Sequence, residues 1–211
     1  MASFDISKSI KITEAMVEES KKSTTRDKYT RMLPDESFVK NEYGKIFEIE
    51  TTNTYQRIKV AADDDQIALL LKLGENLQPP YFILYVLLIP RQGNEKGRYQ
   101  SEIIEDIIDL GLFLHKFKDF LETDGRHHIW IGTVDNSGLL IYDQHNVIYS
   151  YGQLNNQLAT LRKEGFQEQA FSFPVPHAHH YYSENDSYED ELLGYWEWEI
   201  FPLTDQDTYE N

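Results

Sequence analysis

The stretch HIWIGTVDNSGLLIYDQHNVIYSYG (residues 128–152) decides the fold. It holds three runs rich in β-branched and aromatic residues, HIWIGTV, LLIYD and VIYSYG, and turn-forming residues at 135–138 and 144–146 separate them. Short links of this kind join neighbouring antiparallel strands. The stretch therefore predicts a three-stranded antiparallel meander.

Further strands are predicted on both sides of the meander. The run KIFEIET (45–51) alternates as a half-buried strand does, and YFILYVLLI (81–89) is a continuous apolar run typical of a central strand covered on both faces. The runs QAFSF (169–173) and YWEWEIF (195–201) are candidates for two more strands. With the meander, these runs predict five strands and two further candidates.

Three segments have the periodicity of helices. Apolar residues recur at four- and three-residue steps over 101–121, and so many side chains join this stripe that little of the helix is left for solvent. Leu154, Leu158 and Leu161 share one side of a second helix at 153–164. The run IALLLKL follows the acidic triplet 63–65, whose carboxylates are expected to cap the start of a third helix.

The order of these elements predicts one α+β domain. Residues 41–211 form it, with a mixed, mostly antiparallel sheet and two or three covering helices. Residues 1–40 are polar apart from one short amphipathic stretch, so they are expected to be a helical or flexible N-terminal arm.

Composition narrows the class of protein. The chain has 211 residues, no cysteine, and 20 Lys and Arg against 36 Asp and Glu, which gives a formal charge of −16. The absence of cysteine excludes a disulfide scaffold and a thiolate zinc site and is typical of a reducing compartment. With no apolar run of about 18 residues and no signal-like start, the sequence predicts a cytoplasmic protein that does not enter a membrane.

The negative charge is concentrated at the carboxy-terminal end. Residues 164–211 hold 12 acidic residues and no Lys or Arg, so they carry −12 of the total −16. Binding to phosphate groups requires Lys and Arg, so neither nucleic acid nor an anionic membrane is an expected partner. Such a segment attracts a basic protein instead.

Aromatic side chains accompany these acids and favour a surface that binds a partner. Acidic groups steer the encounter with a basic protein, and Tyr and Trp anchors supply binding energy. The predicted partner-binding residues are Tyr181, Tyr182, Glu184, Asp186, Tyr188, Glu189, Asp190, Glu191, Trp196 and Trp198. The alternative is an acidic surface that only keeps the protein soluble.

With these residues on a cysteine-free α+β body, the chain resembles the cytosolic immunity proteins with which bacteria neutralise toxins. The resemblance covers the last third of the chain. It implies a non-catalytic inhibitor without a cofactor, which blocks a basic toxin or enzyme by 1:1 binding.

The histidines of PVPHAHHYY indicate a different class of function. Residues two apart on an extended strand share a face, so His177 and His179, with His180 beside them, are candidate ligands for zinc. A carboxylate such as Glu184 or Asp186 is the expected third ligand. A metal-dependent hydrolase is therefore the alternative function, whereas the spacing of the histidines by itself favours a structural or surface-contact role.

The loop RQGNEKGR (91–98) is the concentrated basic segment of the domain. Its two glycines fit neither the Walker pattern nor GxGxxG, and acidic residues occupy the start of the segment that follows it. The loop is therefore expected to form ion pairs, through Arg91 and Arg98, with the acidic carboxy-terminal third.

Overall fold

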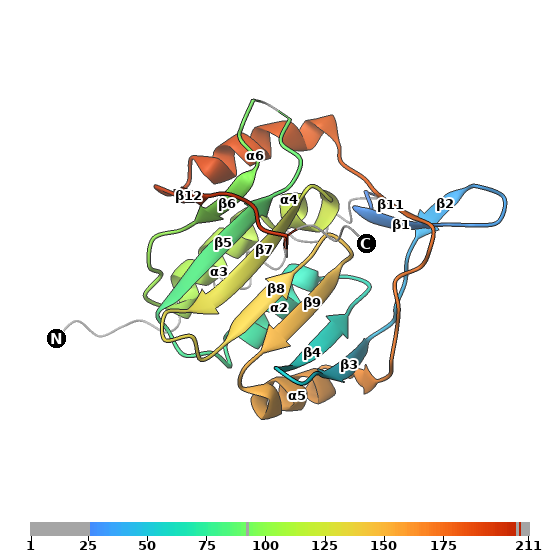
Figure 1. Ribbon diagram of the computed structural model, residues 1–211, viewed down its shortest axis with the longest axis horizontal. Coiled ribbons are helices and arrows are strands. Elements are labelled where there is room, and N and C mark those ends of the chain that lie inside the picture. The colour runs from blue at the N-terminus through green and yellow to red at the C-terminus, as the bar shows by residue number, and fades with distance from the viewer. Residues whose placement is uncertain (1–25, 92, 206, 208–211) are drawn as a thin grey trace, which may run out of the picture.

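The computed structural model describes residues 26–91, 93–205 and 207, which form two β-sheets and five α-helices (Figure 1). The chain order is β1 (Tyr29–Met32), β2 (Phe38–Lys40), β3 (Ile46–Thr51), β4 (Gln56–Ala61), α2 (Gln66–Gly74), β5 (Tyr81–Leu87), β6 (Gly97–Gln100), α3 (Ile107–Lys116), α4 (Lys118–Thr123), β7 (His127–Thr133), β8 (Leu139–Tyr142), β9 (Val147–Tyr151), α5 (Leu154–Lys163), β10 (Gln167–Glu168), β11 (His177–His179), the 3₁₀ turn η1 (Ser183–Asn185), α6 (Asp186–Leu193) and β12 (Glu199–Phe201). No helix within these described ranges is long and apolar enough to cross a membrane.

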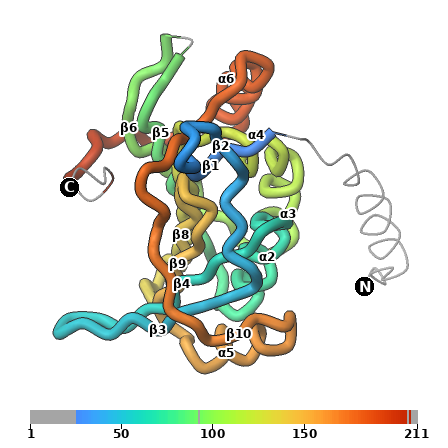
Figure 2. Tube along the Cα trace, turned by 90° about the vertical axis from the view of Figure 1, so that its right-hand side faces the viewer, coloured from blue at the N-terminus to red at the C-terminus, as the bar shows by residue number. Residues whose placement is uncertain are grey.

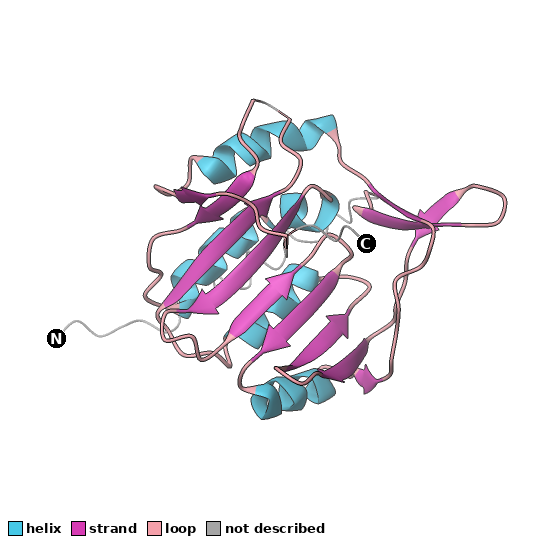
Figure 3. Ribbon diagram, in the orientation of Figure 1, coloured by secondary structure: helices cyan, strands magenta, loops and turns pink. Residues whose placement is uncertain are grey.

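The larger sheet has nine strands in the order β10-β3-β4-β9-β8-β7-β5-β6-β12. Its pairs are antiparallel except β10 with β3, which is parallel. The predicted meander is confirmed as β7, β8 and β9, and β5 lies between β6 and β7 (Figure 3). The α+β class with a mixed, mostly antiparallel sheet is therefore confirmed.

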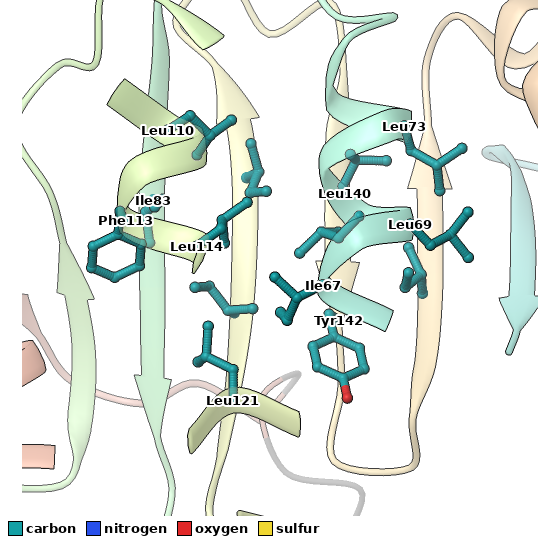
Figure 4. Packing of buried hydrophobic residues seen from close by; sticks show 14 of the residues in the cluster. Ile67, Leu69, Leu73, Ile83, Leu110, Phe113, Leu114, Leu121, Leu140 and Tyr142 are labelled. Carbon is teal, nitrogen blue, oxygen red and sulfur yellow. The ribbon is translucent and has the colours of Figure 1, made fainter. Parts of the chain in front are cut away.

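Helices α2, α3 and α4 cover one face of this sheet (Figure 2). Alternate residues of the central strands, such as Ile83, Ile131 and Leu140, point to that face and are fully buried. They meet the leucines and phenylalanines of the helices, among them Leu114 and Phe113 (Figure 4). Burial of each such side chain contributes roughly 1.5–3 kcal/mol, so this layer supplies most of the stability of the fold.

The smaller sheet has the order β11-β1-β2 and corrects the expectation for residues 1–40. Residues 26–40 are no helical or flexible arm, because β1 pairs with both β2 and β11 and Tyr29 is fully buried. The pairing partner, β11, lies some 150 residues away in the chain, so local pattern gave no signal of it. Residues 1–25 of the predicted arm lie outside the described residues.

The segment between β10 and β11 runs along the sheet face opposite the helices (Figure 2). Phe171 and Phe173 pack there on a second apolar cluster that includes Val147 and Tyr149. The strand expected at 169–173 is not formed, whereas the run 195–201 contains β12. Packing of these two rings and hydrogen bonds such as that from the ammonium of Lys59 to the carbonyl of Phe171, at 2.8 Å, hold the segment against the sheet.

The predicted helix over 101–121 is wrong in its bounds. Helix α3 begins at Ile107, because Asp106 caps it by accepting hydrogen bonds from the amides of Ile108 and Asp109 at 2.8 and 3.0 Å. The helical conformation is interrupted at Phe117, which ends α3 and precedes α4. The stripe of apolar residues is also less buried than its width predicted, since Ile108 remains 56% exposed.

The acidic triplet 63–65 does not cap α2. Asp65 precedes the helix without a side-chain hydrogen bond to it, and its carboxylate contacts the ammonium of Lys118 at 2.7 Å. The amide of Ile67 donates instead to Glu122 of α4 at 2.8 Å. A carboxylate from another helix therefore does the capping.

Candidate metal centre

Three imidazoles converge where the two sheets meet. His145 lies in the turn between β8 and β9, and His177 and His179 share one side of β11. One possible ligand atom from each lies within 4.8 Å of those of the other two. Tetrahedral zinc with Zn–N bonds of about 2.0–2.1 Å needs nitrogens about 3.4 Å apart, so the three rings would have to approach one another to hold it.

Two of the rings are oriented by hydrogen bonds of the kind found behind metal ligands. Nδ1 of His145 donates to the carboxylate of Asp143 at 2.9 Å, and Nδ1 of His177 donates to the carbonyl of Pro174 at 2.7 Å. With Nδ1 engaged in this way, each of these two rings would ligate through Nε2. A carboxylate or carbonyl behind the ring fixes its tautomer and raises its basicity as a ligand.

Asp143 is held in place by the turn itself. Its other carboxylate oxygen accepts hydrogen bonds from the amides of His145 and Val147 at 2.8 and 3.1 Å. Burial alone raises the pKa of Asp143, but the contacts with His145 and His128 and the bond from Val147 hold that pKa below its ordinary value. The carboxylate is therefore ionised and available to orient His145.

His179 contributes the least satisfied atom of the group. Its Nδ1 is buried and has no hydrogen-bond partner within the described residues. Burial, together with His145 and His177, lowers the pKa of His179 to about 3. The ring is therefore neutral at pH 7, as a metal ligand must be, and an unsatisfied buried nitrogen is the feature that a metal ion would remedy.

Aromatic rings enclose the three imidazoles. The ring centroid of Tyr29 lies 5.2 Å from those of His145 and His177 and 5.4 Å from that of His179. Phe173 stacks on His145 at 4.2 Å. Burial raises the pKa of Tyr29 to about 12, so its hydroxyl keeps its proton. These rings restrict water around the centre.

Gly125 permits the close approach of the small sheet to the body. A Cβ atom there would lie 2.9 Å from the carbonyl oxygen of Lys28 and 3.0 Å from Cβ of His179. The amide of Gly125 also donates to the carbonyl of His180 at 2.8 Å. Any larger residue would push β11, and with it two of the three imidazoles, away from the turn that carries His145.

The structure corrects the metal ligands expected from the sequence. His177 and His179 do share a face, but His180 points elsewhere, with its Nε2 2.7 Å from the hydroxyl of Thr30. Glu184 and Asp186 do not join the group either. The third imidazole beside them is that of His145, whose only sequence signal is an Asp two residues earlier in a turn between strands.

The predicted acidic partner-binding residues are mostly engaged within the chain. Glu189 is fully buried and lies 2.9 Å from Arg126, and Asp186 lies 3.6 Å from the same guanidinium. Glu191 pairs with Lys116 at 2.8 Å. Asp190 accepts a hydrogen bond from the side chain of Asn94, and the exposed Glu184 is bonded by its neighbour Ser183.

The predicted aromatic anchors are likewise divided. Trp196 stacks on Phe113 at 4.5 Å, and the indole of Trp198 donates to the carbonyl of Leu192 at 3.2 Å. The hydroxyl of Tyr182 donates to the carbonyl of Asp27. Of these five aromatic residues, only Tyr181 and Tyr188 are exposed, at 51% and 41%.

The ion pairs expected of the basic loop are confirmed. Arg91 lies 3.4 Å from Asp186, and Arg98 lies 3.6 Å from the buried Asp207. The guanidinium of Arg91 also lies over the ring of Tyr181, 4.7 Å from its centroid. The loop therefore ties the acidic carboxy-terminal third to the central strands.

Comparisons with known proteins give no relative. No protein-family model, no curated protein and no solved structure matches this chain.

Proposed function

We propose that the protein is a metal-dependent hydrolase that binds zinc or a similar cation through His145, His177 and His179. Two observations carry the proposal: one possible ligand atom of each imidazole lies within 4.8 Å of those of the other two, and Nδ1 of His179 is buried without a hydrogen-bond partner among the described residues. A third nitrogen ligand replaces the carboxylate that the sequence predicted. In the cysteine-free chain, imidazole is the ligand type that best suits zinc, and we place the activity in the cytoplasm.

Zinc held by these three imidazoles would supply hydroxide near neutral pH, because such a cation lowers the pKa of a bound water to about 7. Asp143 holds His145 in the tautomer that leaves Nε2 free to ligate, and the ring of Tyr29 encloses the three imidazoles on one side. Hydrolysis of an ester or amide is the reaction class that this set supports.

Metal binding is tested on protein purified without a histidine tag, by titration with Zn²⁺ in a calorimeter. We expect one ion per chain and little binding to the variants His145→Ala, His177→Ala and His179→Ala. Asp143→Asn should lower the affinity about 10–100-fold, because it removes the carboxylate behind a ligand. The matched control is His180→Asn, which alters the neighbouring imidazole and should bind normally.

The same proteins separate a catalytic metal from a structural one. Hydrolysis of 4-nitrophenyl acetate should require Zn²⁺, stop on chelation and be lost in the three ligand variants. Equal binding by His177→Ala and the unmodified protein would refute the site. Tight binding without any metal-dependent hydrolysis would refute the hydrolase and leave a structural ion.

The other function predicted from the sequence, capture of a basic toxin by the carboxy-terminal third, stays a prediction. Its buried acids, Asp186 and Glu189, already contact Arg126. An immunity function of that surface would therefore depend on its exposed residues, such as Tyr181, Tyr188 and Glu184.

A further inference from the structure

Aliphatic side chains lie exposed at the start of α3, where the sequence predicted a core. Ile103, Ile108 and Leu112 are 57%, 56% and 44% exposed. The opposite side of the helix is buried, as Leu110 and Leu114 show. The helix therefore has an apolar side that faces the sheet and a second apolar side that faces solvent.

Two of these side chains form one surface. Ile108 and Leu112 are four residues apart in α3, so they are neighbours on the same side of the helix. Leu71 of α2 remains partly exposed, and its methyl groups would lie 3.5 and 3.8 Å from a Cβ atom at Gly111. The apolar surface thus reaches towards a second helix.

The polar groups around this surface are acidic. Glu102, Glu105 and Asp109 are exposed, and no salt bridge engages them within the ranges that the structure describes. The nearest lysines of α3 and α4 are used elsewhere: Lys116 contacts Glu191 at 2.8 Å, and Lys118 contacts Asp65 at 2.7 Å. Unneutralised charge and exposed aliphatic side chains therefore coincide here.

We infer that the α3 face, defined as Glu102, Ile103, Glu105, Ile108, Asp109 and Leu112, docks a basic amphipathic helix of a partner protein. Apolar residues of that helix at i and i+4 fit the pair Ile108 and Leu112, which has the same spacing. Lys and Arg beside them face the three carboxylates, which steer the encounter and discriminate against acidic partners. This inference is independent of the metal centre.

The acidic residues of the α3 face are more available to a basic partner than those of helix α6. The acids of α6 are engaged by Arg126 and Lys116, whereas those of the α3 face are available. The apolar side chains of the α3 face are already exposed, so a partner can bind them without any rearrangement of the core. A basic partner predicted from the net charge is therefore assigned to a different surface of the molecule.

A synthetic 14-residue helix of leucine and lysine, with leucines on one side, is the probe. A scrambled peptide of the same composition is its control, because both carry the same charge. Fluorescence anisotropy with the full chain should show that the amphipathic peptide binds at least about tenfold more tightly than the scrambled one, a difference of about 1.4 kcal/mol. Binding should weaken as salt rises.

Protein variants then locate the binding. The double variant Ile108→Ser/Leu112→Ser should lose about tenfold in affinity, because it removes two apolar anchors. The double variant Glu105→Gln/Asp109→Asn should reduce the salt dependence. The matched controls are Val175→Ser, 86% exposed elsewhere, and Glu197→Gln, and both should bind normally.

Three results would overturn the inference. These are equal affinity for both peptides, unchanged binding by Ile108→Ser/Leu112→Ser, and no binding at all. The peptide would also fail to bind if residues 1–25 of the same chain or a second copy of the protein occupied the α3 face, and that result too would overturn the inference. Circular dichroism of each variant checks that the exposed substitutions leave the fold intact.

Discussion

Single residues set the geometry of the candidate metal centre. Asp143 bonds both the imidazole of His145 and the amides of its own turn, so one carboxylate fixes the loop and the ligand together. Gly125 has a different role, since it provides space: the carbonyl of Lys28 and the side chain of His179 fill the volume that a larger residue would need. Neither role requires contact with the metal.

Gly125→Ala is expected to destabilise the protein by about 1–3 kcal/mol, the usual cost of overpacking a tight site. Because one displaced neighbour, His179, belongs to β11 and is a proposed ligand, zinc affinity should fall as well. The control is Gly111→Ala within α3, where a Cβ atom meets Leu71 at an ordinary 3.5 Å and alanine favours helix. Denaturant unfolding and calorimetry measure both effects, and equal stability of the two variants would contradict this account.

At the scale of elements, one buried arginine joins α6 to the turn that begins β7. Arg126 is 1% exposed, and its guanidinium contacts both carboxylate oxygens of Asp124, at 2.8 and 2.9 Å. It also lies 2.9 Å from Glu189 and 3.6 Å from Asp186, both on α6. The acidic helix α6 can therefore pack against the body of the protein because Arg126 neutralises the carboxylates on its buried side.

Arg126→Met should destabilise the protein by about 3–5 kcal/mol, because buried carboxylates lose the charge that compensates their desolvation. The matched control is Arg162→Met. Arg162 pairs with Glu168 at 3.8 Å on the surface, where both side chains are more than half exposed, so its loss should cost under about 1 kcal/mol. Urea unfolding of both variants compares them, and similar losses would mean that the buried cluster is not the tie between α6 and the body.

Across the whole molecule, folding buries titratable groups that it holds uncharged. Burial and nearby cations keep the pKa of His127 well below its ordinary value, and burial lowers the pKa of His128 to about 4. Burial acts on Glu122 in the opposite sense and raises its pKa to about 7. Stability therefore depends on pH through the fold as well as through net charge.

The free energy of unfolding should fall as pH drops from 6.5 to 4, measured with chelator present. Unfolded histidine binds a proton near pH 6.5 and folded His128 only near pH 4, so in this window the unfolded state holds more protons. His128→Gln should flatten the fall by up to about 1.4 kcal/mol per pH unit. Glu122→Gln should steepen it, because folded Glu122 takes up its proton before the unfolded state does. An unchanged slope in both variants would rule out these two groups as the source.

The sequence determined the meander β7–β8–β9, the central strand β5, helix α5 and the pairing of the basic loop with acidic residues. These follow from periodicity, turn residues and charge, which act over a few positions or through simple attraction. The sequence also showed that His177 and His179 share a face, because that is a property of one strand.

Only the tertiary structure decided what those faces meet. Periodicity tells which side chains share a side of their own element, but it does not tell which distant segment packs there. The partner of β1, the third imidazole at His145 and the choice of Glu122 as the cap of α2 all depend on chain segments brought together by burial of the core. For the same reason the stripe of apolar residues did not show which of them are exposed. The sheet covers only one side of α3.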